Sequence, residues 1–334
     1  MGESLKSLFI FLILLVFVYP YGDIEITEWY RNADAALSIT FDDCDESQYL
    51  IAYPIMEKYN IRGSFGVVIS WVGKTIEQPE GIFIKKMTWE EIRDLGDNEI
   101  SSHSCTHKLL TEINKEDLLF EIQESKRIIE EETGKKCITM HYPYSKTDEY
   151  IKETLEESGY LCARTLESKI NKNPDLYEIS SYAIFDDNHP SLEELKNLLE
   201  ECKKERGWVV IMYHHIDENP ENYTTGSYLP LCITPETFDA QMKLFSSENL
   251  WIASLGEVSS YLRQKETCTI QVKKSLTRIK IIVESEYDIP LTLKIKINWW
   301  KVKVEGSLND GEYSGSFYLN VVPNKEIVIC RVLL

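Results

Sequence analysis

The sequence carries little positive charge for its size. Its 334 residues include 36 Lys and Arg against 55 Asp and Glu, so the formal charge is −19, and no basic cluster interrupts the acidity. An acidic field repels nucleic acid and anionic lipid surfaces. We therefore expect no nucleic acid partner, and the charge favours a neutral or cationic one.

Internal repeats and low-complexity tracts are also lacking. With 43% apolar and 27% charged residues, the composition is that of a globular protein with enough apolar side chains for a core. The length suits one large domain with a small one, or two domains of medium size.

Uninterrupted apolar stretches are short. The longest, residues 8–19, has twelve residues and follows Lys6, whereas a membrane-spanning helix needs about 20. It fits the hydrophobic part of a secretory signal, although no small-residue cleavage site follows. Residues 1–22 are therefore predicted to be either a signal peptide or an uncleaved N-terminal membrane anchor. Both predict an extracellular protein or one attached to the cell surface.

Eight cysteines fit an oxidising compartment. Cys137 and Cys162 fall in successive predicted strands, where a disulfide is geometrically allowed. Cys268 and Cys330 lie near the two ends of the C-terminal segment, and a second disulfide would link these ends. Asn222 begins N-Y-T, a glycosylation sequon.

Apolar strands alternate with amphipathic helices from about residue 35 to 265, which indicates a largely parallel sheet or barrel. In the longest predicted helix, Asn114 caps the start and Gly134 marks the end. The predicted strands are 35–41, 61–70, 99–102, 137–142, 160–165, 208–213 and one near 251. The predicted helices are 46–60, 89–95, 114–133, 147–158, 192–204 and 235–245.

Helical spacing disappears from residue 267 onward. Leu291, Leu293, Ile295 and Ile297 alternate with Thr and Lys at period two, which is typical of half-buried strands. About seventy residues built from such strands are most simply a small β-sandwich. We place the domain boundary at residues 264–267.

Adjacent carboxylates close the first predicted strand. The motif T-F-D-D ends in Asp42 and Asp43, at the strand end where active sites gather in parallel α/β folds. The two side chains point in different directions, so one is placed to bind a metal while the other faces substrate. The alternative is an ordinary helix N-cap, a role that Asp45 would also fill.

A pair of histidines follows the third predicted strand. His103 and His107 stand at i and i+4 in H-S-C-T-H, a spacing that lets both converge on one ion. The chain has only six His in 334 residues, so two within one pentapeptide are more than an even distribution would give. The alternative is two surface histidines in a polar loop. Cys44 and Cys105, next to these motifs, are interpreted as small packing residues.

Two further strands end in polar clusters. In H-Y-P-Y at 141–144, the Pro fixes a turn and leaves the amide of Tyr144 to donate into the cleft. In M-Y-H-H at 212–215, His214 follows an apolar strand. Each cluster alone also fits an ordinary strand end. Four clusters on one predicted sheet together suffice for metal-assisted hydrolysis of an acyl bond.

This series resembles the polysaccharide deacetylases of the NodB-homology type, carbohydrate esterase family 4. Their pattern of T-F-D-D, H-S/T-x-x-H, R-x-P-Y and L-x-H occurs here in the same order, over residues 35–265. The resemblance implies an α/β fold, with a distorted (β/α)7 barrel as catalytic domain at 23–265. The small all-β sandwich would then follow at 266–334.

The resemblance also implies a divalent metal ion held by Asp43, His103 and His107. Two His and one carboxylate suit Zn²⁺, while Co²⁺, Mn²⁺ and Ni²⁺ fit the same ligands. Asp42 would be the base that takes a proton from a water acidified by the metal. The amide of Tyr144 would stabilise the oxyanion, and His214 would protonate the leaving amine or hydroxyl.

Some residues depart from the family pattern. His141 stands where the family has Arg, a residue that tunes the catalytic base. We hypothesise that Arg164, at the end of the next strand, reaches that base instead. The acidic residue that tunes the catalytic His has no clear copy, and Glu167 is the candidate. His215 stands where Asp is common.

The sequence thus predicts an exported hydrolase that removes acetyl groups from N-acetylated amino sugars of a surface or extracellular glycan. The alternatives are an O-acetyl esterase acting on acetylated polysaccharide, and a degenerate carbohydrate-binding surface protein. A cytosolic amide hydrolase is disfavoured by residues 8–19. Trp299 and Trp300 are candidates for stacking on sugars, and we expect at least one to pack in the sandwich core instead.

Overall fold

The computed structural model describes residues 23–78, 81–184, 190–219 and 232–332. The predicted signal or anchor at 1–22 and the sequon at Asn222 lie outside the described residues. Within these ranges, no helix combines the length and the apolar character that crossing a bilayer requires.

Seven parallel strands form a closed barrel, as predicted. Their order is β2-β3-β6-β7-β8-β9-β10, and β10 pairs back onto β2 to close the ring. A further parallel strand, β13 (Leu250–Ile252), lies beside the first half of β2. The barrel strands are β2 (Ala35–Phe41), β3 (Ser64–Val67), β6 (Glu99–Ser102), β7 (Thr139–His141), β8 (Cys162–Leu166), β9 (Ile179–Ala183) and β10 (Trp208–Tyr213).

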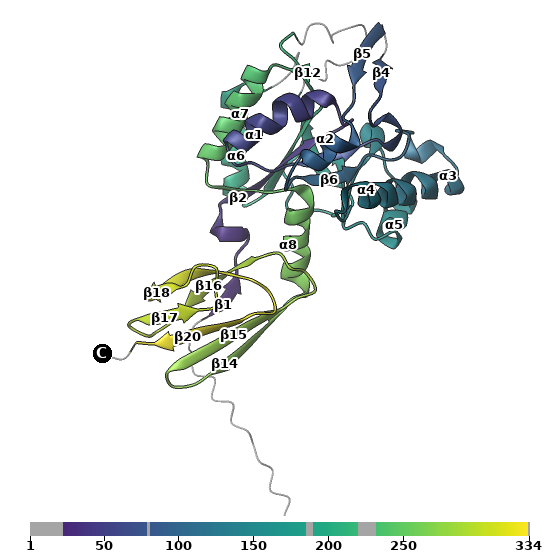
Figure 1. Cartoon of the computed structure of the whole chain (residues 1–334). Coiled ribbons are helices and arrows are strands. Elements are labelled where there is room, and N and C mark those ends of the chain that lie inside the picture. The colour runs from purple at the N-terminus through teal and green to yellow at the C-terminus, as the bar shows by residue number, and fades with distance from the viewer. Residues whose placement is uncertain (1–22, 79–80, 185–189, 220–231, 333–334) are drawn as a thin grey trace, which may run out of the picture.

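Helices follow most of these strands and cover the barrel (Figure 1). The side chain of Asn114 accepts a hydrogen bond from the Asp117 amide at the start of the longest run, and Gly134 ends it with φ 69°. The α-helices are α1 (Tyr53–Lys58), α2 (Trp89–Asp94), α3 (Lys115–Leu119), α4 (Ser125–Thr133), α5 (Glu149–Glu157), α6 (Leu192–Glu205), α7 (Pro235–Ser247) and α8 (Leu255–Thr267). Shorter turns are η1 (Tyr30–Asn32), η2 (Gln48–Ala52), η3 (Ile69–Trp71), η5 (Leu110–Glu112), η6 (Phe120–Glu124) and η7 (Pro143–Ser145).

The two faces of the barrel strands differ in character. Along β2, Leu37, Ile39 and Phe41 belong to the main hydrophobic cluster together with side chains of the surrounding helices. The alternate residues Ser38 and Thr40 are buried and polar. Small hydroxyl residues recur on other strands, where they bond to one another or to larger buried groups. Because these hydroxyl side chains are small, larger polar side chains also fit inside the barrel.

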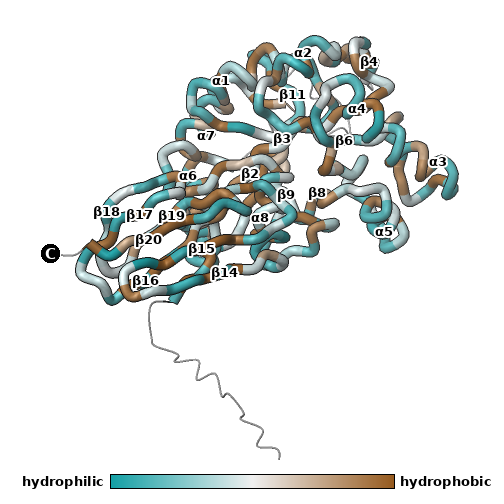
Figure 2. The backbone as a smooth tube through the Cα atoms, turned by 60° about the horizontal axis from the view of Figure 1, so that its bottom comes forward, coloured by the Kyte–Doolittle hydropathy of each residue, from teal (hydrophilic) through white to brown (hydrophobic). Residues whose placement is uncertain are grey.

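The C-terminal region is a β-sandwich of antiparallel strands, as predicted. One sheet has the order β1-β16-β19 and the other β14-β15-β20-β17-β18. Figure 2 shows hydrophobic and hydrophilic stretches alternating along these strands. The strands are β1 (Ile24–Ile26), β14 (Thr269–Lys274), β15 (Arg278–Glu284), β16 (Leu291–Lys296), β17 (Val302–Glu305), β18 (Gly311–Tyr313), β19 (Ser316–Val321) and β20 (Glu326–Arg331).

The expected boundary at residue 23 needs correction, because β1 belongs to the sandwich and not to the barrel. It pairs with β16, with Ile24 opposite Ile295, and so covers an edge that would otherwise be open. The chain then passes through Trp29 into the amino end of β2. Trp251 and Tyr261 of the barrel domain pack against the sandwich core. The sandwich therefore adjoins the amino ends of the barrel strands (Figure 1).

Some elements were not predicted. These are the barrel strand β9, helix α8, the hairpin of β4 (Thr75–Gln78) with β5 (Ile82–Lys85), and the short pair β11 (His215–Ile216) with β12 (Cys232–Ile233).

Both candidate disulfides are wrong for this structure, in which all eight cysteines are free. Cys162 lies opposite Thr139, two residues beyond Cys137, and the two thiols join different hydrophobic clusters. Cys330 lies opposite one end of β15, while Cys268 precedes the strand that pairs with the other end. The length of β15 therefore separates the second pair.

Candidate active site

The four predicted clusters meet at the carboxyl end of the barrel. They follow β2, β6, β7 and β10, which the topology places in one ring. Side chains far apart in the sequence are thereby brought within a few ångströms of one another. This is the end of a parallel barrel where loops build active sites.

Asp43, His103 and His107 face one point. Oδ1 of Asp43 lies 3.5 Å from Nε2 of His103 and 3.6 Å from Nε2 of His107, and the two Nε2 atoms are 3.1 Å apart. Ligand atoms bonded to one tetrahedral zinc at about 2.0–2.1 Å lie roughly 3.3–3.4 Å from one another. In the described part of the chain, Oδ1 of Asp43 is buried and makes no hydrogen bond. Donor type, spacing and this orphaned oxygen all fit a divalent metal ion.

The backbone around these ligands is folded tightly. Asp43, Ser104 and His107 all have positive φ, at 72°, 69° and 58°, which is uncommon for residues other than Gly and concentrates at functional sites. Oγ of Ser104 accepts a hydrogen bond of 2.9 Å from the His107 amide and closes the turn. Nδ1 of His103 donates to the carbonyl of His141 at 2.7 Å, so its Nε2 is left to face the ligand point.

Asp42 stands beside the three ligands and is itself buried. Arg164 donates from one guanidinium nitrogen to both of its carboxylate oxygens, and the contact to Oδ2 is 2.5 Å. Nδ1 of His141 donates to Oδ1 at 2.7 Å. Arg164 thus lies where the sequence analysis placed it, and His141 shares the same carboxylate.

Burial and charge act in opposite directions on these groups. Burial alone would raise the pKa of Asp42, but Arg164, His103 and His141 together hold it well below its usual value. Burial, with Arg164 nearby, lowers the pKa of His141 to about 4. Burial, with His103 nearby, lowers that of His107 to about 4. At neutral pH, Asp42 is therefore a carboxylate, and His107 is neutral, as a metal ligand must be.

His214, which follows β10, also lies near Asp42. Its Nε2 is 4.0 Å from Oδ2 of Asp42, and within the described chain its buried Nδ1 has no hydrogen-bond partner. Glu167 does not fill that gap, because its half-exposed carboxylate pairs with Lys169. The structure therefore gives no support to Glu167 as the tuning residue. His215 turns away and contacts Asp45 at 3.2 Å.

Two rings flank His107. The ring centroids of Trp71 and Tyr144 each lie 4.8 Å from that of His107. Tyr144 has φ 57° and is 58% exposed, so its ring forms part of the rim that a ligand would meet.

Two supporting residues, Lys86 and Gln48, were missed by sequence reasoning. Lys86 is fully buried, pairs with Asp45, and places its Nζ 4.6 Å from the Trp71 ring. Nε2 of Gln48 donates to the carbonyls of Asp42 and His214 and joins two strand ends. Lys86 is the second of two consecutive lysines after a short apolar run, and nothing in the sequence singled out Lys86 or Gln48.

Cys44 and Cys105 are buried packing residues, as interpreted. Burial raises the pKa of each thiol to about 12, so neither is a nucleophile at neutral pH.

Comparison with known proteins agrees with this geometry. Residues 30–163 match the sequence profile of the polysaccharide deacetylase family. This chain carries a polysaccharide deacetylase domain. The match contains Asp42, Asp43, His103, His107 and His141, and it ends one residue before Arg164.

Individual relatives of this deacetylase domain are distant. A poly-β-1,6-N-acetyl-D-glucosamine N-deacetylase of Staphylococcus aureus (strain MSSA476) is 29% identical over 159 residues, which are 45% of this chain and 54% of that protein. YxkH of Bacillus subtilis (strain 168), named provisionally as a polysaccharide deacetylase, is 24% identical over 148 residues. These residues are 44% of this chain and 50% of the length of YxkH. The chain thus spans about half the length of the curated relatives that it matches.

Among solved structures, the Streptococcus pyogenes deacetylase PplD in complex with acetate is 19% identical to this chain. The alignment covers 49% of this chain and 69% of that one, with a TM-score of 0.43.

Proposed function

We propose that this protein is a metal-dependent deacetylase that removes acetyl groups from N-acetylated amino sugars of a surface or extracellular polysaccharide. The observation that carries the proposal is the convergence of Asp43, His103 and His107 on one point, next to the carboxylate of Asp42. The family of the domain supports the same reaction class.

Asp43, His103 and His107 would hold the metal, for which Zn²⁺ is our first choice. When bound, such an ion polarises the acetyl carbonyl and acidifies water. Asp42, kept ionised by its neighbours, accepts the proton of the attacking water.

The remaining roles fall to groups around the cleft. The amide of Tyr144 donates to the oxygen that becomes negative as the acetyl carbon is attacked. His214 delivers a proton to the departing sugar nitrogen, so that a free amine and acetate leave. Arg164 and His141 hold Asp42 in place and do not touch the reacting atoms.

The substrate class is inferred from chemistry and from relatives. The staphylococcal relatives are named for poly-β-1,6-N-acetyl-D-glucosamine, and the charge of −19 favours a substrate that is neutral and a product that is cationic. The apolar run at residues 8–19 supports action outside the cytoplasm.

Acetate release tests the proposal. We expect release from N-acetylglucosamine oligomers by the full chain, loss of release with a chelator, and recovery when Zn²⁺, Co²⁺, Mn²⁺ or Ni²⁺ is added back. Release from acetylated xylan alone would establish an O-acetyl esterase instead. A metal-loaded protein that releases acetate from neither glycan would contradict enzymatic activity. Since His214 has no partner on Nδ1 in the described chain, that outcome would indicate a degenerate binding protein.

A further inference from the structure

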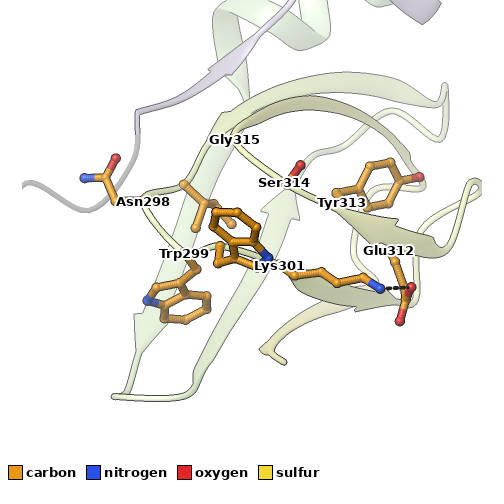
Figure 3. Close-up of a pocket in the computed structure, with 9 residues that line it drawn as sticks. Asn298, Trp299, Lys301, Glu312, Tyr313, Ser314 and Gly315 are labelled. Carbon is orange, nitrogen blue, oxygen red and sulfur yellow. Dashed lines mark ion pairs between the residues drawn. The ribbon is translucent and has the colours of Figure 1, made fainter. Parts of the chain in front are cut away.

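A hollow of about 630 Å³ lies on the β-sandwich, outside the active site. It is lined by residues 297–301, which follow β16, and by residues 312–315, at the end of β18. Figure 3 shows residues of both segments that line this space, with the ion pair between Lys301 and Glu312 as a dashed line. Its volume is in the range of ordinary ligand sites.

Neighbouring indoles in this hollow have different environments. Trp299 is only 8% exposed and belongs to the sandwich core, whereas Trp300 is 81% exposed. Trp299 therefore behaves as the packing residue that we expected, and Trp300 does not contribute to the core. Trp300 lines the hollow and leaves most of its indole surface in contact with solvent, where a ligand can reach it.

Polar groups beside Trp300 suit a ligand rich in hydroxyls. Nζ of Lys301 and a carboxylate oxygen of Glu312 are 2.5 Å apart, and both side chains are about half exposed. The ring of Tyr313 is fixed by stacking on Phe317 at 4.6 Å. The two charges cancel, so a neutral ligand meets no net field from this pair.

Aromatic faces next to paired polar groups are complementary to a pyranose ring. The C–H face of a pyranose can pack on an indole, and its hydroxyls can donate to a carboxylate such as that of Glu312 and accept from an ammonium such as that of Lys301. A flat protein partner would instead require a broad apolar patch, and here Trp300 projects alone beside charged side chains.

The hollow and the active site lie on different domains, with the barrel between the sandwich and the metal ligands. The sandwich adjoins the amino ends of the barrel strands, and the metal ligands follow their carboxyl ends (Figure 1). One sugar unit cannot reach both places, whereas a long polymer can contact both.

The charges at the hollow suit an uncharged ligand. Lys301 and Glu312 line it and pair with one another, and an N-acetylated sugar unit carries no charge. Deacetylation turns that unit into a strongly hydrated ammonium ion, which loses hydration on binding here and finds the Glu312 carboxylate already paired.

We infer that the hollow around Trp300 is a carbohydrate-binding site that holds neutral, N-acetylated sugar units of a polymer. The choice of the N-acetylated polymer depends on the proposed function, while binding of a neutral sugar at Trp300 does not. The site would retain the chain on acetylated glycan and release it from stretches that are already deacetylated.

Binding is measured on the full chain with a chelator present, so that no turnover occurs and a failure of the deacetylase proposal leaves this test intact. The probe is a β-1,6-linked N-acetylglucosamine oligomer, titrated by calorimetry. We expect Trp300→Ala to weaken binding at least tenfold, and Trp300→Phe, which keeps a ring, to stay within threefold of wild type. Leu276→Ala, which removes an 88% exposed apolar side chain elsewhere on the sandwich, is the matched control and should bind like wild type.

Three results would overturn the inference. The first is equal binding by Trp300→Ala and wild type. The second is an equal loss in the Leu276→Ala control, which would indicate non-specific adhesion. The third is tighter binding of the deacetylated oligomer than of the acetylated one. Sedimentation of the same proteins would show whether Trp300→Ala dissociates an oligomer, in which case the hollow is a contact between copies of the chain.

Discussion

Asp42 owes both its position and its charge to two neighbours. Arg164 and His141 reach it from the strands β8 and β7, and burial in the absence of these partners would favour the protonated acid. The role proposed for Asp42, accepting a proton near neutral pH, therefore depends on these two neighbours.

Replacing Arg164 tests this dependence. We expect Arg164→Gln to lower kcat by about 100-fold, since the base is misplaced and partly protonated. Because loss of the guanidinium raises the pKa of Asp42, the acid limb of the pH–rate profile should move to higher pH. Arg164→Lys keeps a cation and should leave the limb near its original position. Unchanged kcat in Arg164→Gln would exclude the proposed role.

The buried histidines also make stability depend on pH. In the native protein the pKa values of His107 and His141 are about 4, against an ordinary value of 6.5. Below pH 6.5 the unfolded chain binds protons that the native protein does not, so the free energy of unfolding falls as the pH decreases towards 4. At pH 5, each of the two histidines lowers the free energy of unfolding by about 2 kcal/mol relative to its value well above pH 6.5.

Urea unfolding of the chelated protein at pH 7 and pH 5 measures this effect. The stability should be lower at pH 5, and His141→Gln should show a smaller difference between the two pH values. The pKa of His103 is raised, which offsets part of this effect in wild type. The same difference between the two pH values in His141→Gln and in wild type would therefore contradict the assignment of a neutral, buried His141.

Strand β3 contributes to the site by leaving space. A Cβ on Gly66 would lie 2.6 Å from Nδ1 of His141 and 3.0 Å from the carbonyl oxygen of Phe41, and neither neighbour is free to withdraw, because both residues are fully buried. The glycine therefore permits the hydrogen bond between His141 and Asp42.

Gly66→Ala should consequently lower kcat at least tenfold while metal binding stays within a few-fold of wild type. Gly311→Ala is the matched control, since a Cβ there meets only ordinary contacts, the closest at 3.6 Å from Tyr313. Full activity of Gly66→Ala, measured by acetate release, would contradict this account of β3.

Some elements were predictable from sequence and others were not, for physical reasons. β2, β6 and β10 matched their predicted bounds because each is a short buried run. β9 was missed because Ser180 and Ser181 replace the apolar residues that mark a strand, and Ser181 serves Arg164 within the barrel. Helix α8 was also missed, although it could have been predicted, since Ser254 and Glu257 form a capping box at its start.

The same division holds for the site. The candidate metal ligands and Asp42 stand in short motifs at strand ends, so their positions could be noticed from spacing, while their roles came from the family resemblance. Lys86, Trp71 and Gln48 act through contacts between distant segments. Such contacts leave no local pattern, and only the folded chain reveals them.

The two domains share a buried junction. Tyr261 of α8 is fully buried against the sandwich and donates to the carbonyl of Thr27 at 3.0 Å, and Trp251 packs on the ring of Tyr261 at 5.0 Å. β1, which precedes the first barrel strand in the chain, completes a sheet of the sandwich.

Truncation after Thr267 should therefore destabilise the barrel as well. The loss of β16 leaves β1 unpaired and exposes the two aromatic side chains, so we expect aggregation or a lower Tm than in the full chain. Size-exclusion chromatography and thermal melting measure both. A monomeric truncated barrel with an unchanged Tm would show that the domains are independent.

The whole account depends on one divalent ion shared by Asp43, His103 and His107, and calorimetric titration of chelator-stripped protein with Zn²⁺ tests this most directly. We predict one equivalent bound by wild type and by Asp42→Asn, with turnover lost in Asp42→Asn, and binding at least 100-fold weaker in His103→Ala and His107→Ala. Wild-type affinity in both His variants, or no binding by wild type, would contradict the account.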